Sequence, residues 1–185
     1  MMSDAADRWN ARYADAADSV PEAARVLLQG AQWLPACSPE APLDALDLAC
    51  GRAGNGQWLA ERGYRVTAWD VSELVIEQIA RRRPALIAHC EVRDVSSQPP
   101  EPDSFDIIVV ARFLDRALCP AIAQALKPGG VLFYQTFTHG LSNDDYLLRS
   151  NELLDLFDSL NILEYHEPEP DASGKAEAQL VARRP

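Results

Sequence analysis

The residues with the clearest potential for chemistry are glycines and one acid in a short part of the chain. Gly51, Gly54 and Gly56 follow a mostly apolar segment, and Asp70 comes nineteen residues after Gly51. Glycines let a backbone approach a ligand closely at the end of a strand, and an acid about 20 residues further on can accept hydrogen bonds from ribose hydroxyls. This spacing predicts a site for an adenosine-containing cofactor, either S-adenosylmethionine or a nicotinamide dinucleotide.

Such a site needs a sheet that brings several strand ends together. From Leu43 onward, strand-like and helix-like segments alternate, which is typical of a parallel sheet with helices on both faces. The clearest strand is 105–111, a run of branched apolar residues suited to a position buried on both sides, in which Asp106 is expected to be structural. We expect parallel strands at 43–49, 65–70, 85–93, 105–111 and 131–137, and helices at 55–62, 72–83 and 118–126.

The C-terminal part predicts a different strand connection. A helix at 151–160 precedes two short strands, 162–166 and 178–183. The segment between the two strands is shorter than the dozen or more residues that a parallel crossover normally needs. We therefore expect these strands to form an antiparallel hairpin.

The N-terminal part is predicted to be helical. Residues 4–34 are typical of one or two helices, with Pro21 near the start of the second, and a loop follows to Pro42. Length favours one compact domain. Within it, we expect residues 1–42 to form a helical cap over the cofactor site and residues 43–185 to form the core.

Composition limits the partners. The formal net charge of the 185-residue chain is -11, whereas nucleic-acid binding draws its affinity from many Lys and Arg contacts to phosphate. No apolar run approaches the roughly 20 residues of a membrane span, and the acidic start lacks the apolar core of a signal peptide. We therefore expect a cytoplasmic protein with neither a nucleic-acid nor a membrane partner.

Cysteine and histidine spacing predicts no metal site. The four cysteines contain no C-x-x-C pair, and the three histidines are scattered. The one basic cluster, 81–83, ends a predicted helix before Pro84, where cations complement the helix dipole, and this favours a structural role over phosphate binding.

Beyond these physical arguments, the chain resembles the class I S-adenosylmethionine-dependent methyltransferases from Leu43 to Arg183. Residues 47–51, Asp-Leu-Ala-Cys-Gly, are similar to the first motif of that family, and Asp70 matches its ribose-binding acid. Residues 93–95, Arg-Asp-Val, resemble the motif whose aspartate and following amide hold the adenine. The resemblance implies a Rossmann-like, seven-stranded, mostly parallel sheet with a C-terminal antiparallel hairpin. It also implies S-adenosylmethionine as cofactor and S-adenosylhomocysteine as product.

Within this class, the chain is most similar to small bacterial methyltransferases of the tellurite-resistance and thiopurine-methyltransferase type. Residues 9–13, Trp-Asn-Ala-Arg-Tyr, resemble the W-x-x-R-Y sequence whose Trp and Arg lie against the methionine end of the cofactor. Simple helix packing of Trp9 against Tyr13, and a turn role for Asp94, are the alternatives. The cofactor-binding residues that the resemblance implies are Trp9, Arg12, Asp47, Ala49, Gly51, Asp70, Val71, Asp94, Val95, Ala111 and Arg112.

The glycine-containing loop departs from the family pattern at two positions. Ala49 and Ala53 stand where glycine is common. Alanine is harmless at negative φ, but a positive φ would strain or reshape the loop.

Two other functions remain open from the sequence. Residues 49–54 are one residue away from the G-x-G-x-x-G pattern of NAD(P)-dependent oxidoreductases. Against that function, Asp47 lies where dinucleotide sites generally carry an apolar residue, and it would suit the amine of a methionine moiety. A protein that binds S-adenosylmethionine without transferring its methyl group is the second alternative.

No residue stands out as a catalytic base. A soft acceptor such as a thiolate needs little base, whereas a hydroxyl or amine needs one within hydrogen-bond reach. The Asn-Pro-Pro-Tyr type of site after the fourth strand is absent, which disfavours nucleobase and glutamine methylation. We expect a small-molecule methyl acceptor near Arg112, Phe113, His139 and Tyr146, and a monomer or homodimer.

Overall fold

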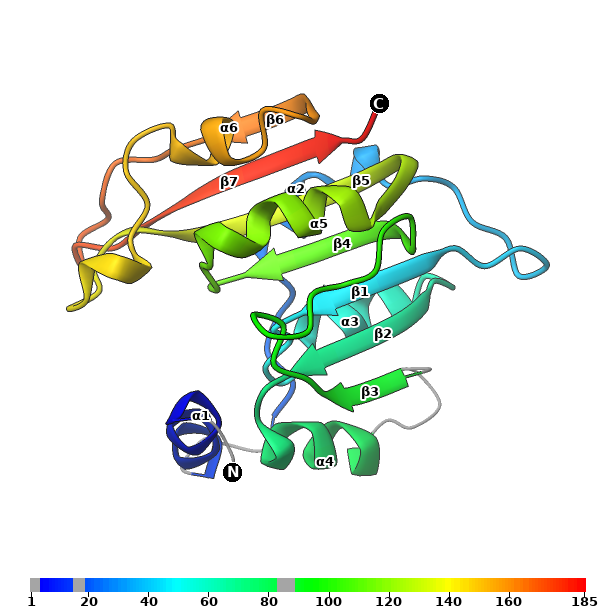
Figure 1. Cartoon of the computed structure of the whole chain (residues 1–185), viewed down its shortest axis with the longest axis horizontal. Coiled ribbons are helices and arrows are strands. Elements are labelled where there is room, and N and C mark those ends of the chain that lie inside the picture. Colours follow the sequence, from blue (N-terminus) through cyan, green and yellow to red (C-terminus); the bar gives the residue numbers. More distant parts are fainter. Residues whose placement is uncertain (1–3, 15–18, 83–88) are drawn as a thin grey trace.

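The computed structural model describes residues 4–14, 19–82 and 89–185. These residues form a seven-stranded sheet with the order β3-β2-β1-β4-β5-β7-β6 (Figure 1). Strands β1 to β5 are parallel, and β7 runs antiparallel to both β5 and β6. The predicted fold is therefore confirmed. The strands are β1 (Asp44–Leu48), β2 (Arg65–Asp70), β3 (His89–Val92), β4 (Phe105–Ala111), β5 (Leu126–His139), β6 (Asn161–His166) and β7 (Ala176–Arg183).

Helices cover both faces of this sheet. Helices α2, α3 and α4 lie on one face and α5 and α6 on the other (Figure 1), and their apolar side chains pack against the sheet. Among the described residues, no helix is long and apolar enough to cross a bilayer. The helices are α1 (Asp4–Ala14), α2 (Arg25–Gln29), α3 (Gly54–Ala60), α4 (Glu73–Arg82), α5 (Cys119–Ala125) and α6 (Glu152–Leu156), with short 3₁₀ turns η1 (Ala31–Trp33), η2 (Arg116–Leu118) and η3 (Asp144–Tyr146).

The central strands bury side chains on both faces. In β4, Ile107 packs with the α2–α4 layer and Ile108 with the α5–α6 layer, and both are completely buried. Phe133 and Tyr134 repeat this alternation in β5. Each such side chain contributes roughly 1.5 to 3 kcal/mol of burial free energy. The continuous apolar pattern of these strands follows from this two-sided burial.

The start of β5 differs from the expected helix 118–126 and strand 131–137. The strand begins at Leu126, and its pairing with β4 jumps from Phe105–Leu126 to Ile107–Val131. The intervening Lys-Pro-Gly-Gly segment bulges, with Gly129 at φ 80°. A Cβ on Gly130 would meet three backbone carbonyl oxygens at 2.9 to 3.1 Å. There is no room for a side chain at this position, so glycine is required.

The predicted start of the second helix is wrong. Helix α2 begins at Arg25, four residues after Pro21. The backbone N–H of Ala24 donates to Asn55 Oδ1 at 2.8 Å, and this contact with α3 holds the preceding segment in a non-helical path. The predicted stop at Pro84 and the beginning of the third strand at 85–88 lie outside the described residues.

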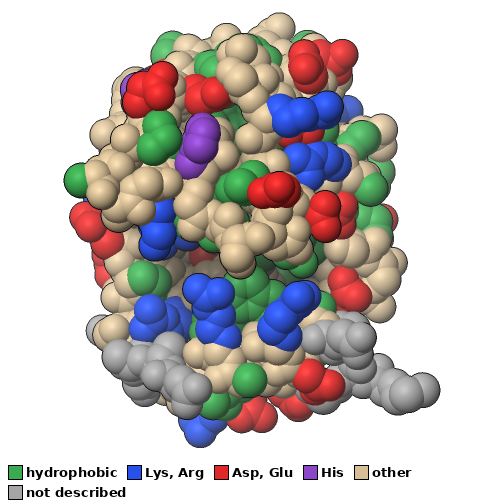
Figure 2. Space-filling model, turned by 90° about the vertical axis from the view of Figure 1, so that its left-hand side faces the viewer, with side chains coloured by type: hydrophobic (Ala, Val, Ile, Leu, Met, Phe, Trp, Pro, Cys, Tyr) green, Lys and Arg blue, Asp and Glu red, His purple; other side chains and the backbone are tan. Residues whose placement is uncertain are grey.

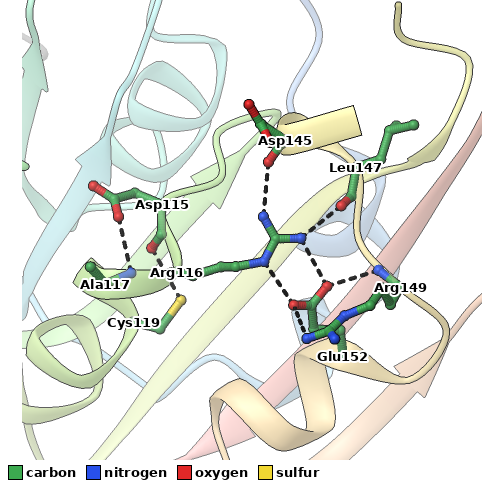
Figure 3. Close-up of polar contacts among 8 residues, drawn as sticks. All are labelled: Asp115, Arg116, Ala117, Cys119, Asp145, Leu147, Arg149 and Glu152. Carbon is green, nitrogen blue, oxygen red and sulfur yellow. Dashed lines mark hydrogen bonds and ion pairs between the residues drawn. The ribbon is translucent and has the colours of Figure 1, made fainter. Parts of the chain in front are cut away.

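The connection from β5 to α6, residues 140–151, is fixed by Arg116 (Figure 3). The Arg116 guanidinium donates to Glu152 at 2.7 and 3.0 Å, and also to the carbonyls of Asp145 and Leu147, both at 2.8 Å. The side chain of Glu152 is 4% exposed. Its pairing with Arg116, and further hydrogen bonds from Arg149, lower its pKa from 4.5 to about 2.

We predict an acid-dependent stability contribution from Glu152. Because its folded pKa is depressed, the contribution is fully present above about pH 4.5 and is lost as the pH falls through about 2. Glu152→Gln should lower the free energy of unfolding at pH 7 by roughly 2 to 3 kcal/mol, a deficit that shrinks below pH 4.5. Denaturant unfolding across pH measures this, with the exposed Asp155→Asn as control. A deficit that does not change with pH would contradict the assignment.

Candidate functional site

The carboxyl ends of β1, β2, β3 and β4 meet at one edge of the sheet, on the left of Figure 1. Nine of the eleven predicted cofactor-binding residues lie in or directly after these four strands, and Trp9 and Arg12 lie on α1. Figure 2 looks at this edge and shows Lys and Arg side chains gathered around hydrophobic ones. The topology therefore brings the predicted strand-end residues to a common edge.

The loop between β1 and α3 adopts an unusual backbone. Ala49, Gly51 and Ala53 have φ values of 52°, 53° and 59°, all in the left-handed region. Left-handed geometry costs a residue with a Cβ roughly 1 to 2 kcal/mol. Alternating left-handed residues turn the chain tightly, and the Ala53 N–H bonds to the Cys50 carbonyl at 2.9 Å. The loop keeps its tight turn despite its two alanines and carries the strain.

Asp70 holds this loop from β2. Its Oδ2 accepts the Gly51 N–H and its Oδ1 accepts the Ser72 N–H, both at 2.9 Å. The residue is 6% exposed. Burial raises its pKa above the ordinary value, and the backbone N–H groups of Ser72, Gly51 and Val71 oppose that rise. Each carboxylate oxygen can accept a further hydrogen bond, which suits a pair of ribose hydroxyls.

Asp47 performs a different task at the end of β1. It is completely buried, and its carboxylate accepts the Gly56 N–H at 2.8 Å and the Asn55 side-chain amide at 3.3 Å. Burial raises its pKa from 3.8 to about 7, against the opposing effect of these two donors. Because both oxygens accept bonds from α3, the observed role of Asp47 is to fix that helix. Its contact with a cofactor amine stays a prediction.

Helix α1 carries two residues near the site that were not among the cofactor-binding residues predicted from the sequence. Asn10 Oδ1 accepts the Ser72 hydroxyl at 2.6 Å and so ties α1 to the residue before α4. Tyr13 lies over the loop, because a Cβ on Gly51 would come within 3.0 Å of its hydroxyl. Burial, followed by the nearby charge of Asp70, raises the Tyr13 pKa. The Trp-x-x-Arg-Tyr pattern contained Tyr13, but nothing in the sequence singled out Asn10.

The observed contacts of Trp9 are with its own helix neighbours. Its ring stacks on Tyr13 with centroids 5.7 Å apart, and the Arg12 guanidinium carbon lies 5.2 Å from the Trp9 centroid. The packing alternative weighed from sequence is therefore present. Cofactor contact by Trp9 and Arg12 stays a prediction.

The segment after β3 forms a turn. Asp94 Oδ1 accepts the Ser96 N–H at 3.2 Å, and the Asp94 carbonyl accepts the Gln98 N–H at 2.8 Å. Val95 is buried in the core. The turn role of Asp94 is thus observed, and its adenine contact stays a prediction. Arg93 belongs to the same motif but was given no role from sequence, and its guanidinium carbon lies 3.9 Å from the Trp69 ring centroid.

The expected acceptor-side residues follow β4 and β5. Arg112 comes directly after β4, and the Phe113 carbonyl accepts the Tyr134 hydroxyl at 2.9 Å. His139 ends β5 and is exposed, and Tyr146 is 41% exposed on the connection fixed by Arg116. Asp106 is the second residue of β4, at the opposite end of the strand, where it accepts hydrogen bonds from the Asp44 N–H and Lys127. The prediction of a structural role for Asp106 is confirmed.

This sheet order confirms the Rossmann-like, seven-stranded fold that the resemblance implied, and solved methyltransferase structures share it. Residues 45–130 match the family model of the methyltransferase domain. A ubiquinone biosynthesis O-methyltransferase from Idiomarina loihiensis is 31% identical over 111 residues, which make up 53% of this chain and 44% of that relative. The chain thus matches less than half the length of this curated relative.

Two solved structures share the fold. TehB from Haemophilus influenzae has a TM-score of 0.73 at 20% identity, over 97% of this chain and 67% of TehB. A coclaurine N-methyltransferase bound to N-methylheliamine and S-adenosylhomocysteine has a TM-score of 0.68 at 13% identity, over 86% of this chain and 71% of that chain. At these identities the likeness concerns the fold.

We predict that glycine relieves strain in the loop. Ala49→Gly should raise the free energy of unfolding by roughly 0.5 to 1 kcal/mol, because the left-handed penalty exceeds the entropy that glycine adds to the unfolded chain. Ala53→Gly should gain less, because Ala53 is 1% exposed and the packing of its methyl group is lost. The control Ala80→Gly, exposed inside α4, should instead lose roughly 1 kcal/mol. Destabilisation by Ala49→Gly would show that the loop is not strained.

Proposed function

We propose that this protein binds S-adenosylmethionine at the carboxyl edge of the sheet and transfers its methyl group to a small organic acceptor. The observation that carries the proposal is the Asp70 carboxylate, fixed 2.9 Å from the Gly51 N–H beside a left-handed loop. A buried carboxylate at this place suits the ribose of an adenosine cofactor. The methyltransferase-domain match over 45–130 supports the identity of that cofactor.

The residues fit such a cofactor in chemical type. Asp70 would hold the ribose, Asp94 with the Val95 N–H the adenine, and Arg12 with Trp9 the methionine end. The loop residues Ala49 and Gly51, with Val71 after β2, Ala111 at the end of β4 and the backbone of Arg112, complete the cofactor surface. When bound, the cofactor supplies a methyl group already activated by its positively charged sulfonium.

The protein then has to position the acceptor. Orientation of reacting groups can lower a barrier by roughly 7 to 11 kcal/mol. Phe113, His139 and Tyr146, together with Arg112, are proposed to surround the acceptor. No catalytic base is assigned. The net charge of -11 supports a small-molecule acceptor over a nucleic acid.

The alternative of a nicotinamide-dependent oxidoreductase is weaker. The polar Asp47 is built into the end of β1, at a position where dinucleotide sites generally have an apolar residue, and it organises α3. The matches also name methyltransferases. Binding without methyl transfer is the second alternative, and acceptor screening distinguishes it from the proposed function.

The first test is calorimetric titration of ligand-free protein with S-adenosylmethionine, S-adenosylhomocysteine and NAD in parallel. We expect micromolar dissociation constants, about -8 kcal/mol of binding free energy, for the first two ligands and no binding of NAD. Binding of NAD alone would overturn the proposal and direct the search to hydride transfer.

Asp70→Ala tests the proposed ribose contact. Loss of a charge-assisted hydrogen bond should weaken S-adenosylhomocysteine binding by roughly 1.5 to 3 kcal/mol. Because Asp70 also bonds the loop backbone, Asp70→Asn, which keeps an acceptor, serves as the milder variant, and the exposed Asp158→Ala is the control. Unchanged affinity in a folded Asp70→Ala protein would remove this residue from the site.

A further inference from the structure

Arg112 occupies a strained position directly after β4. Its φ of 58° is left-handed, although the residue carries a large side chain. Its N–H donates to the Gln135 carbonyl of β5 at 2.7 Å, which fixes the backbone. Strained residues persist where the surrounding structure imposes them, and they concentrate at functional sites.

The Arg112 side chain is held by a series of hydrogen-bonded, buried polar side chains. Its Nε donates at 2.7 Å to Glu177 Oε1 on β7, and Glu177 is 5% exposed. The other oxygen of Glu177 accepts the side-chain amide of Gln135. Gln135 in turn accepts the Val26 N–H of α2 at 2.9 Å. Each side chain in this series is hydrogen-bonded to the next, so the buried core sets the orientation of the guanidinium.

This anchoring leaves the other side of the guanidinium open. The side chain of Arg112 is 66% exposed, and its two terminal nitrogens have no hydrogen-bond partner in the part of the chain that the structure describes. The guanidinium lies 5.8 Å from the Phe137 ring centroid, beside an apolar surface. A fixed guanidinium with free terminal N–H groups matches the two oxygens of a carboxylate.

Other arginines at this edge are engaged differently. Arg116 and Arg149 both pair with Glu152, and Arg93 donates to the carbonyls of Gln98 and Pro99. These guanidinium groups therefore have structural roles. Arg112 instead combines a buried anchor with terminal nitrogens that have no hydrogen-bond partner among the described residues.

The buried anchor of this guanidinium lies away from the proposed cofactor residues on β1 and β2. Its partner Glu177 lies on β7, three strands across the sheet from β1, which is about 14 Å at the usual strand spacing. The glycine-containing loop and Asp70 lie on the other side of β4. His139 and the connection that carries Tyr146 lie on the same side as the guanidinium.

We propose, building on the proposed function, that Arg112 binds a carboxylate group of the methyl acceptor and that Glu177 positions Arg112 for this contact. The substrate class is then a small organic carboxylate with an apolar body that contacts Phe137. The carboxylate of the substrate is a recognition group. The methyl-accepting atom is a different atom of the substrate, on its side toward β4.

The test is a titration of S-adenosylhomocysteine-saturated protein with benzoate and phenylacetate, and with benzamide and phenylacetamide as uncharged counterparts. At least one acid should bind roughly tenfold or more tightly than its amide. Arg112→Gln should remove this preference, Arg112→Lys should restore part of it, and Glu177→Gln should weaken it. The control Arg149→Gln changes an arginine that is 84% exposed at the same edge, and it should leave the preference intact.

Several outcomes would overturn the proposal. These are no binding of either acid, equal binding of acids and amides, or an acid preference that survives in folded Arg112→Gln. A loss of S-adenosylhomocysteine affinity in Arg112→Gln, with unchanged binding of methylthioadenosine, would assign Arg112 to the carboxylate of the cofactor instead. The same titrations without cofactor separate the two hypotheses, because failure to bind S-adenosylhomocysteine contradicts the proposed function while the acid preference still reports on Arg112.

Discussion

Two buried carboxylates hold the glycine-containing loop, and the rest of the site depends on them. Asp70 binds the loop at Gly51, and Asp47 binds the helix that follows at Gly56. Burial raises the pKa of both carboxyl groups, so each is kept at a cost in desolvation. That cost is offset by the backbone N–H groups of a tight turn, which would otherwise lack partners.

The same interactions extend to the N-terminal segments. Asn55, beside Asp47, accepts the Ala24 N–H, so the segment leading into α2 is attached to the start of α3. Asn10 attaches α1 to Ser72, next to Asp70. The helical residues that precede β1 are thus connected by hydrogen bonds to the ends of β1 and β2. This arrangement couples the placement of α1 and α2 to the geometry of the loop.

Across β4 the edge of the sheet is organised by buried ion pairs. Glu177 fixes Arg112 after β4, and Glu152 fixes Arg116, which in turn holds the connection bearing Tyr146. In both pairs the acid is buried and the arginine reaches toward the surface. The difference lies in the free donors: Arg116 donates to two backbone carbonyls, whereas Arg112 retains its terminal N–H groups among the described residues.

The sequence by itself determined the strands and the acid of the site, because these depend on local pattern. The strand 105–111 was predicted with the bounds observed for β4, since an unbroken apolar run implies burial on both faces. Asp70 was predicted from the number of residues that separate it from the glycines in the sequence. Tertiary structure decided the start of α2, through a contact with Asn55 that lies 31 residues away from Ala24. It also decided the pairing of Arg112 with Glu177, 65 residues apart, because β7 inserts between β5 and β6 and no local spacing encodes that neighbour.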